Sequence, residues 1–283
     1  RSAVRAGDWS LILFTLLTKT FVGAFITLVI VHWRIGRSGE RDAADALARR
    51  SLPVLACLLA LAVMVSLTHL GSPSRALYSL DNLAASWLSR EVLLVCLVAG
   101  CGAVLGLMLW RAWGSRSLRR VLAALTAAFG LALVFAMSRV YMLATVPPWD
   151  RFATPLAFFS TTALLGVLTV TAMVVIIVRV TASDAVRRLL HRLTLVVLGL
   201  LGLRLVTILI TALPVAGAPV PGPAPWVPAL QGALVVIAAV TLWAARGRAR
   251  SPTFLVFLAI LLVSGAELLG TVLFFASYWR LGI

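Results

Sequence analysis

Charged residues are scarce in this sequence, and acidic ones above all. Nine acidic residues and a single lysine accompany 24 arginines, and together they make up 12% of the 283 residues. Hydrophobic residues account for 62%, and apolar runs of about twenty residues recur along the chain. Runs of this length exclude a soluble globular protein. They predict an all-α, polytopic membrane helical bundle, because a helix satisfies its own backbone hydrogen bonds in lipid.

Cysteine and histidine are scarce too, with three residues of each type. The three cysteines, Cys57, Cys96 and Cys101, lie inside apolar runs without CxxC spacing. This argues against an iron–sulfur cluster, a zinc site or a disulfide framework within the chain. His32 and His191 fall at the ends of predicted spans and not in their cores, so we do not expect them to bind haem. We therefore expect no metal and no bound cofactor here.

The apolar runs predict eight transmembrane helices in a single integral membrane domain, residues 1–283. The first run is too long for the core of a signal peptide and lacks an obvious cleavage site, so we interpret it as the first span. The predicted spans are residues 9–32, 52–70, 91–110, 121–143, 156–178, 193–213, 229–245 and 253–275.

Arginines are distributed unevenly among the connections between these spans. Alternate connections carry most of them, whereas the others hold only Arg75, Arg90 and Arg151. By the positive-inside rule the arginine-rich connections are cytoplasmic, which predicts both termini on the outer side of the membrane, the periplasmic side if the cell is a Gram-negative bacterium. A net charge of +16 would suggest nucleic acid binding in a soluble protein, but here it is explained by membrane orientation.

The connection between the second and third predicted spans holds the residues best suited to chemistry. Gly71 and Pro73 predict a sharp turn at the membrane surface. His69 precedes this turn, and Arg75 and Glu91 are expected at a similar depth. Together these groups can take protons from a small redox molecule and hold its charge. The structural alternative is a histidine that caps carbonyl groups and an arginine that anchors at the headgroups.

Two further polar residues, Arg139 and Tyr141, precede a rigid proline turn in the next outer connection, Thr145-Val-Pro-Pro-Trp-Asp150. At about 1.5 Å per residue, Arg139 is expected roughly one turn below the outer surface, level with His69. Snorkelling of its guanidinium to the headgroups is the alternative explanation.

Three charged residues are predicted at membrane depth: Lys19 in the first span, Arg204 in the sixth and Glu267 in the eighth. Because a charge at the bilayer centre costs a few kcal/mol, each is expected to face the bundle and find a partner. Structural pairing and a proton path both remain open. Gly102 and Gly106 form a GxxxG motif in the third span, which predicts close helix packing there.

The sequence resembles the membrane-anchor subunits of bacterial dimethyl sulfoxide reductase, a family of proteins with eight spans. The most specific of the resembling blocks is His69-Leu-Gly-Ser-Pro-Ser-Arg75. The others are Asp8-Trp-Ser-Leu-Ile-Leu-Phe-Thr15, Ser86 to Glu91, Arg139-Val-Tyr141, Thr145-Val-Pro147 with Trp149, Thr154-Pro155 and Gly265-Ala-Glu267-Leu-Leu-Gly270.

This resemblance implies a complex of three subunits: the anchor, an electron-transfer subunit with [4Fe–4S] clusters, and a catalytic subunit with a molybdopterin cofactor. It also implies that the anchor oxidises menaquinol, with His69 and Glu91 as the residues involved in the oxidation. The sequence departs from the family pattern at two positions. Lys19 stands where the family pattern has a residue with a neutral amide side chain, and Thr271 stands where it has an arginine.

We therefore expect menaquinol to enter from lipid, give two protons to His69 and Glu91, and pass two electrons to an iron–sulfur partner on the outer surface. Arg75 would stabilise the developing quinolate. Tyr78, Arg139 and Tyr141 would complete the pocket. The alternatives are a passive anchor, or a secondary transporter or proton-translocating subunit that uses Lys19, Arg204 and Glu267. No internal repeat of the kind that transporters show is evident.

Overall fold

The computed structural model describes residues 8–68, 80–178, 184–212, 226–247 and 252–278, and these residues form eight long helices and no strand. All eight are long and apolar enough to cross a membrane, so the predicted fold class is confirmed. The helices are α1 (Asp8–Arg37), α2 (Arg41–Thr68), α3 (Trp87–Trp110), α4 (Arg116–Tyr141), α5 (Ala153–Val178), α6 (Asp184–Ala212), α7 (Trp226–Gly247) and α8 (Pro252–Ala276).

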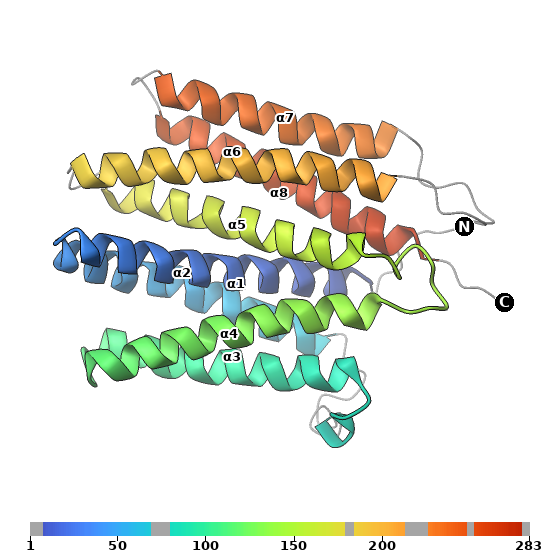
Figure 1. Ribbon diagram of the computed structural model, residues 1–283, viewed down its shortest axis with the longest axis horizontal. Coiled ribbons are helices and arrows are strands. Elements are labelled where there is room, and N and C mark those ends of the chain that lie inside the picture. The colour runs from blue at the N-terminus through green and yellow to red at the C-terminus, as the bar shows by residue number, and fades with distance from the viewer. Residues whose placement is uncertain (1–7, 69–79, 179–183, 213–225, 248–251, 279–283) are drawn as a thin grey trace.

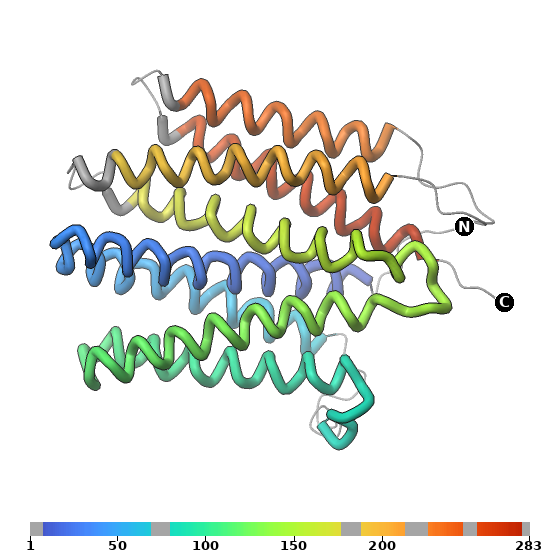
Figure 2. Tube along the Cα trace, in the orientation of Figure 1, coloured from blue at the N-terminus to red at the C-terminus, as the bar shows by residue number. Residues whose placement is uncertain are grey.

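The helices form one elongated bundle with α1 and α5 at its centre (Figure 1). The α3–α4 hairpin lies along one edge and the α7–α8 hairpin along the other, as the trace in Figure 2 shows. The most apolar stretches of α1 and α5 are 61% and 67% buried inside the protein, whereas the corresponding stretches of the other helices are 17–39% buried. Side chains on these two helices are therefore the ones best shielded from lipid.

Two glycines bring the central helices together. A Cβ atom at Gly23 of α1 would collide with the backbone carbonyl of Thr162 in α5, and one at Gly166 would collide with the backbone of Gly23. Only glycine therefore allows α1 and α5 to approach this closely. The prediction of close packing at Gly102 and Gly106 is wrong, because a Cβ atom at either position would make only ordinary contacts with neighbouring side chains.

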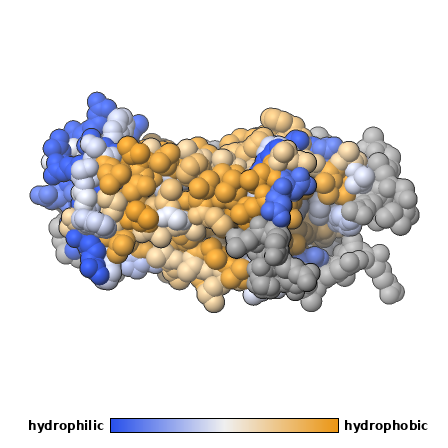
Figure 3. Space-filling model, turned by 90° about the horizontal axis from the view of Figure 1, so that it is seen from below, coloured by the Kyte–Doolittle hydropathy of each residue, from blue (hydrophilic) through white to orange (hydrophobic). Residues whose placement is uncertain are grey.

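The surface of the bundle is apolar along its length and hydrophilic where α1 ends and α2 begins (Figure 3). We call this the arginine-rich end, and the opposite end, where α1 begins and α8 finishes, the Glu91 end. Several helices extend past the predicted spans, since α2 begins at Arg41 and α6 at Asp184. The length of an apolar run predicts only the part of a helix that lies in the membrane. The backbone hydrogen bonds of the helix can continue beyond that part, so the helix itself is longer. The assignment of the arginine-rich end to the cytoplasm stays a prediction.

Candidate functional site

The structure describes three of the six residues predicted to bind quinol: Glu91, Arg139 and Tyr141. The other three, His69, Arg75 and Tyr78, lie outside the described residues, so their roles stay predictions. The described three come from neighbouring helices, α3 and α4, and all lie near the Glu91 end of the bundle.

Glu91 lies in the second turn of α3 with its side chain turned inward, and the residue is only 9% exposed. The helix starts earlier than predicted because the Ser86 hydroxyl accepts a hydrogen bond from the Ser89 backbone N–H at 3.3 Å and caps it. Glu91 is therefore a turn further from the helix N-terminus than predicted, where the helix dipole contributes little. Within the described residues, its carboxylate has no hydrogen bond or ion pair.

Arg139 lies against α3 through the ring of Trp87. Its guanidinium carbon is 5.5 Å from the centre of this ring, and the guanidinium of Arg90 lies 4.3 Å from it. Trp87 is one helical turn before Glu91, so both side chains project from the same face of α3. Arg139 and the buried carboxylate therefore lie at the same end of the bundle, with Trp87 in contact with the arginine.

Tyr141 is the centre of an aromatic cluster that joins α4, α5 and α8. Its ring contacts those of Trp149, Phe158, Phe274 and Phe275 at centroid distances of 5.4–5.9 Å. The Trp149 indole N–H donates to the backbone carbonyl of Phe274 at 2.8 Å, which holds the proline turn against α8.

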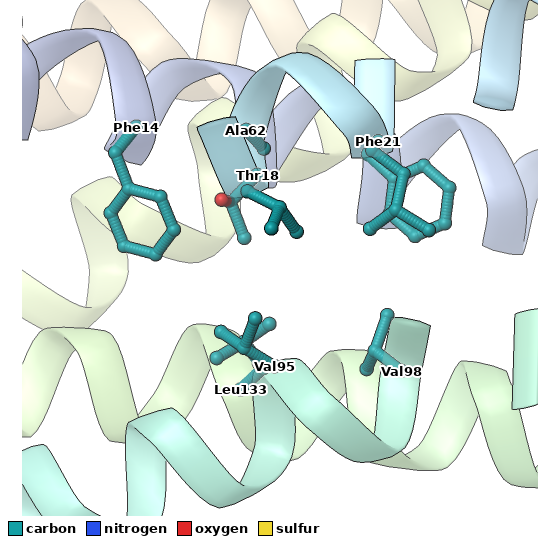
Figure 4. A pocket seen from close by; sticks show the side chains of 9 residues that line it. Phe14, Thr18, Phe21, Ala62, Val95, Val98 and Leu133 are labelled. Carbon is teal, nitrogen blue, oxygen red and sulfur yellow. The ribbon is translucent and has the colours of Figure 1, made fainter. Parts of the chain in front are cut away.

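A narrow apolar crevice separates the α1–α2 hairpin from the α3–α4 hairpin (Figure 4). Phe14, Thr18 and Phe21 line it from α1, and Val95 and Val98 line it from α3. The buried hydroxyl of Thr18 has no hydrogen-bond partner among the residues that the structure describes. Glu91 lies on the same face of α3, one turn before Val95, so the carboxylate is found where the crevice approaches the Glu91 end.

The three charges predicted at membrane depth all lie inside the bundle. Lys19, Arg204 and Glu267 are 4%, 5% and 1% exposed, respectively. The Arg204 Nε–H donates to Glu267 Oε1 at 2.5 Å, and the Thr161 hydroxyl donates to Glu267 Oε2 at 2.7 Å. Lys19 lies apart from this pair, with its Nζ 4.1 Å from the centre of the Phe158 ring. The predicted pairing is thus confirmed for Arg204 and Glu267.

Three polar residues beside this ion pair were not predicted from the sequence, namely Thr161, Thr207 and Gln231. Thr207 accepts a hydrogen bond from the Arg204 guanidinium at 3.1 Å. Gln231 of α7 is 4% exposed and lies with Arg204 beside Gly270, and its buried amide nitrogen has no hydrogen-bond partner among the described residues. A sequence signal existed for Gln231, since it is the only glutamine in the chain and occurs inside an apolar run. Thr161 and Thr207 had no such signal, because threonines are frequent in these spans.

The remaining histidines and the cysteines do not converge. His32 Nε2 lies 2.8 Å from Asp45 Oδ1 at the arginine-rich end, where both side chains are about half exposed. Among the described residues, no group of three or more histidine, cysteine or acidic side chains could hold a metal ion. The three cysteines lie on α2 and α3, with Cys57 and Cys96 exposed on the bundle surface.

Comparison with known proteins agrees with this architecture. Residues 5–276 match the family model of the DMSO reductase anchor subunit (DmsC). The YnfH subunit of an anaerobic dimethyl sulfoxide reductase of Escherichia coli is 30% identical over 288 aligned positions, which cover 98% of this chain and 96% of the relative. The C subunit of the anaerobic dimethyl sulfoxide reductase of the same organism is 32% identical over 168 positions, 57% of this chain and 55% of the relative. The match to nearly the whole length, together with the eight apolar helices, shows that this multi-pass membrane protein belongs to the DMSO reductase anchor subunit family.

Proposed function

We propose that this chain binds menaquinol near the Glu91 end of the bundle, oxidises it, and passes the electrons to an iron–sulfur partner subunit. The complex would be completed by a molybdenum catalytic subunit and would serve anaerobic respiration at the bacterial inner membrane. Family membership supports an anchoring role, and the names of the relatives point to a reductase complex. The quinol chemistry rests on the site itself.

The observation that carries the proposal is the buried Glu91 carboxylate, which has no partner among the residues that the structure describes. A carboxylate inside a membrane protein costs a few kcal/mol unless a donor satisfies it. A quinol carries hydroxyl donors on an aromatic ring that is attached to a long apolar tail. The hydroxyl would satisfy the carboxylate, and the ring and tail would lie along the apolar surface of the bundle, because the crevice one turn away, about 10 Å³, has room for only about one water.

The residues then have separate roles in removing two protons and two electrons. Glu91 would accept the proton from one hydroxyl as the ring is oxidised, and His69 would accept the second. Arg139 lies against Trp87 at the same end of the bundle, and its positive charge would stabilise the anion that forms when the first proton leaves. Arg75 and Tyr78 are proposed to line the same site, and Tyr141 holds the helix ends around it through its aromatic contacts.

The electrons require an acceptor outside the chain, because the scattered cysteines do not form a ligand set for a cluster. A [4Fe–4S] cluster of the partner would have to lie close to Glu91, which places the docking surface at the Glu91 end.

The alternative function, a transporter, would be favoured by a polar passage through the bundle. The buried Lys19, Arg204 and Glu267 are the residues that such a passage would use.

A binding titration tests the proposal directly. The assembled complex in detergent is titrated with a menaquinol analogue, and Glu91→Gln is compared with the unchanged protein and with Glu40→Gln. Glu40 lies at the arginine-rich end, so its substitution controls for the loss of one carboxylate. We expect Glu91→Gln to weaken binding or oxidation about tenfold or more, the loss of one charge-assisted hydrogen bond. Equal titration curves for all three proteins would remove Glu91 from the site.

A further inference from the structure

In the middle of the bundle, the described buried charges are two cations and one anion; the fourth buried charge, Glu91, lies near the Glu91 end. Lys19 of α1, Arg204 of α6 and Glu267 of α8 are all nearly inaccessible. Glu267 already accepts hydrogen bonds from Arg204 and Thr161. In the part of the protein that the structure describes, Lys19 has no hydrogen bond or ion pair, and only the face of the Phe158 ring lies beneath its ammonium. With all groups charged, the cluster carries a net charge of +1.

Such a net charge in a low-dielectric interior is unfavourable, and a buried group relieves it by changing its protonation state. Arginine does not lose its proton in proteins. Lysine can, because its ammonium releases a proton readily when it is desolvated. Of the two cations, Lys19 is therefore the one able to exchange a proton.

The described surroundings of Lys19 supply no other counter-charge. Glu267 of α8 and Arg204 of α6 lie about one turn along α5, because Thr161, which binds Glu267, is one turn from the Phe158 ring. Phe158 and Thr161 are uncharged, and Tyr141 of α4 packs its ring against Phe158 within the aromatic cluster. Residues 52–68, the apolar part of α2 beside α1, include no charged residue.

A cavity of about 120 Å³ lies beside Glu267 and has room for water. Since one water molecule needs roughly 10–15 Å³ by this measure, several fit. Thr20, Thr169 and Ser264 contribute hydroxyl oxygens to the wall. Thr169 and Ser264 lie nearer the arginine-rich end than the ion pair does, so the polar wall extends from Glu267 in that direction.

We propose that Lys19 and Glu267 form a proton-transfer site in the middle of the membrane, with water molecules in the cavity beside Glu267. This site is separate from the Glu91 site. An N–H bond of the Lys19 ammonium breaks, an O–H bond forms on Glu267 or on a cavity water, and no electron moves. Glu267 is the link, because it lines the cavity and binds Thr161, which lies one turn along α5 from the Phe158 ring beneath Lys19. Arg204 holds that carboxylate in place.

The single lysine in the sequence makes the test unusually direct. The protein is labelled with ¹⁵N-lysine and placed in lipid bilayers, so that solid-state NMR shows one Nζ resonance, whose shift distinguishes ammonium from neutral amine. We expect this resonance to change from ammonium to amine within the pH range in which the protein stays folded. A resonance that remains ammonium throughout that range would overturn the proposal.

Two variants give opposite shifts if the charge count is right. Arg204→Met frees Glu267 for Lys19, so the ammonium should persist to higher pH. Glu267→Gln leaves two cations without an anion, so the amine should appear at lower pH. Shifts in the same direction would contradict the assignment. The measurement on the unchanged protein stands even if a variant fails to fold, and it needs no quinol, so its failure is distinct from failure of the proposed function.

The role of the cavity is tested by the rate of hydrogen exchange at Nζ after transfer to D₂O. Ser264→Leu places a larger apolar side chain at the cavity wall and should slow exchange severalfold. Gly265→Leu is the matched control on the same helix, because a Cβ atom there meets nothing within 4 Å. Equal rates in the two variants would show that the cavity is not the route.

Discussion

Removing Arg204 should destabilise the protein far more than breaking an exposed ion pair. The Arg204 and Glu267 side chains are 7% and 1% exposed, and Arg204→Met would leave a carboxylate in the bundle interior without its principal partner. Breaking a buried pair from one side costs about 3–5 kcal/mol. We expect a loss near the lower limit, because Lys19 can move toward Glu267 and compensate in part.

The protein provides its own reference pair at the arginine-rich end. His32 and Asp45 are 41% and 47% exposed, so water already solvates both groups. Pairs of this kind contribute about 0–1 kcal/mol, and Asp45→Asn should therefore change the free energy of unfolding by no more than that. The two substitutions separate the effect of burial from the effect of losing an ion pair.

Unfolding of the purified protein in mixed micelles, followed by circular dichroism as denaturing detergent is added, gives the free energies. The double variant Arg204→Met with Glu267→Met should be more stable than Glu267→Met alone, because one uncompensated cation remains in the cluster and not two. Adding Lys19→Met to Arg204→Met should cost further stability, since Glu267 then has no cation at all. The reasoning is falsified if Arg204→Met costs no more than Asp45→Asn.

Three other predictions concern the quinol site, the topology and the helix packing. His69→Ala should abolish quinol-dependent turnover and leave the partner subunits attached and active with an artificial dye donor; retained quinol oxidation in an assembled complex would exclude His69. In a protein without its native cysteines, a single cysteine at Ser74 should react with an impermeant reagent in intact cells. A single cysteine at Ser117 should not react. The reverse pattern would move the Glu91 end to the cytoplasm. Gly166→Leu should reduce stability by about 1–3 kcal/mol or more, because α1 must move away from α5; an unchanged unfolding transition would show that the two backbones are not in contact.

Much of the candidate site followed from the types of residue and their positions along the sequence. A glutamate beside an interfacial connection, an arginine and a tyrosine near the next one, and three charges inside apolar runs are exceptions to the local composition, so each stood out. Their burial was predictable for the same reason, because charges in a span avoid lipid. The start of α3 was misplaced, since Trp87-Leu-Ser-Arg90 looked like connection until Ser86 was seen to cap it.

The partners of these residues were not predictable. That Arg204 pairs with Glu267 while Lys19 faces Phe158 depends on how α1, α5, α6 and α8 rotate against one another. The rotation is decided by packing, and packing in a membrane depends on where backbones can approach. The GxxxG motif of α3 suggested one place, but the approach occurs at Gly23 and Gly166, which lie on different helices far apart in the sequence.

The sequence by itself determined the number of membrane helices, their type and the end at which arginines gather, because these follow from local composition and from the cost of placing polar backbone in lipid. Tertiary structure alone decided which helices occupy the centre, where a crevice reaches Glu91, and that one cation in the described interior lacks an anion. The physical reason is that every span is apolar on nearly all sides. Hydrophobicity therefore cannot select neighbours, and close backbone contacts and a few buried polar groups select them instead.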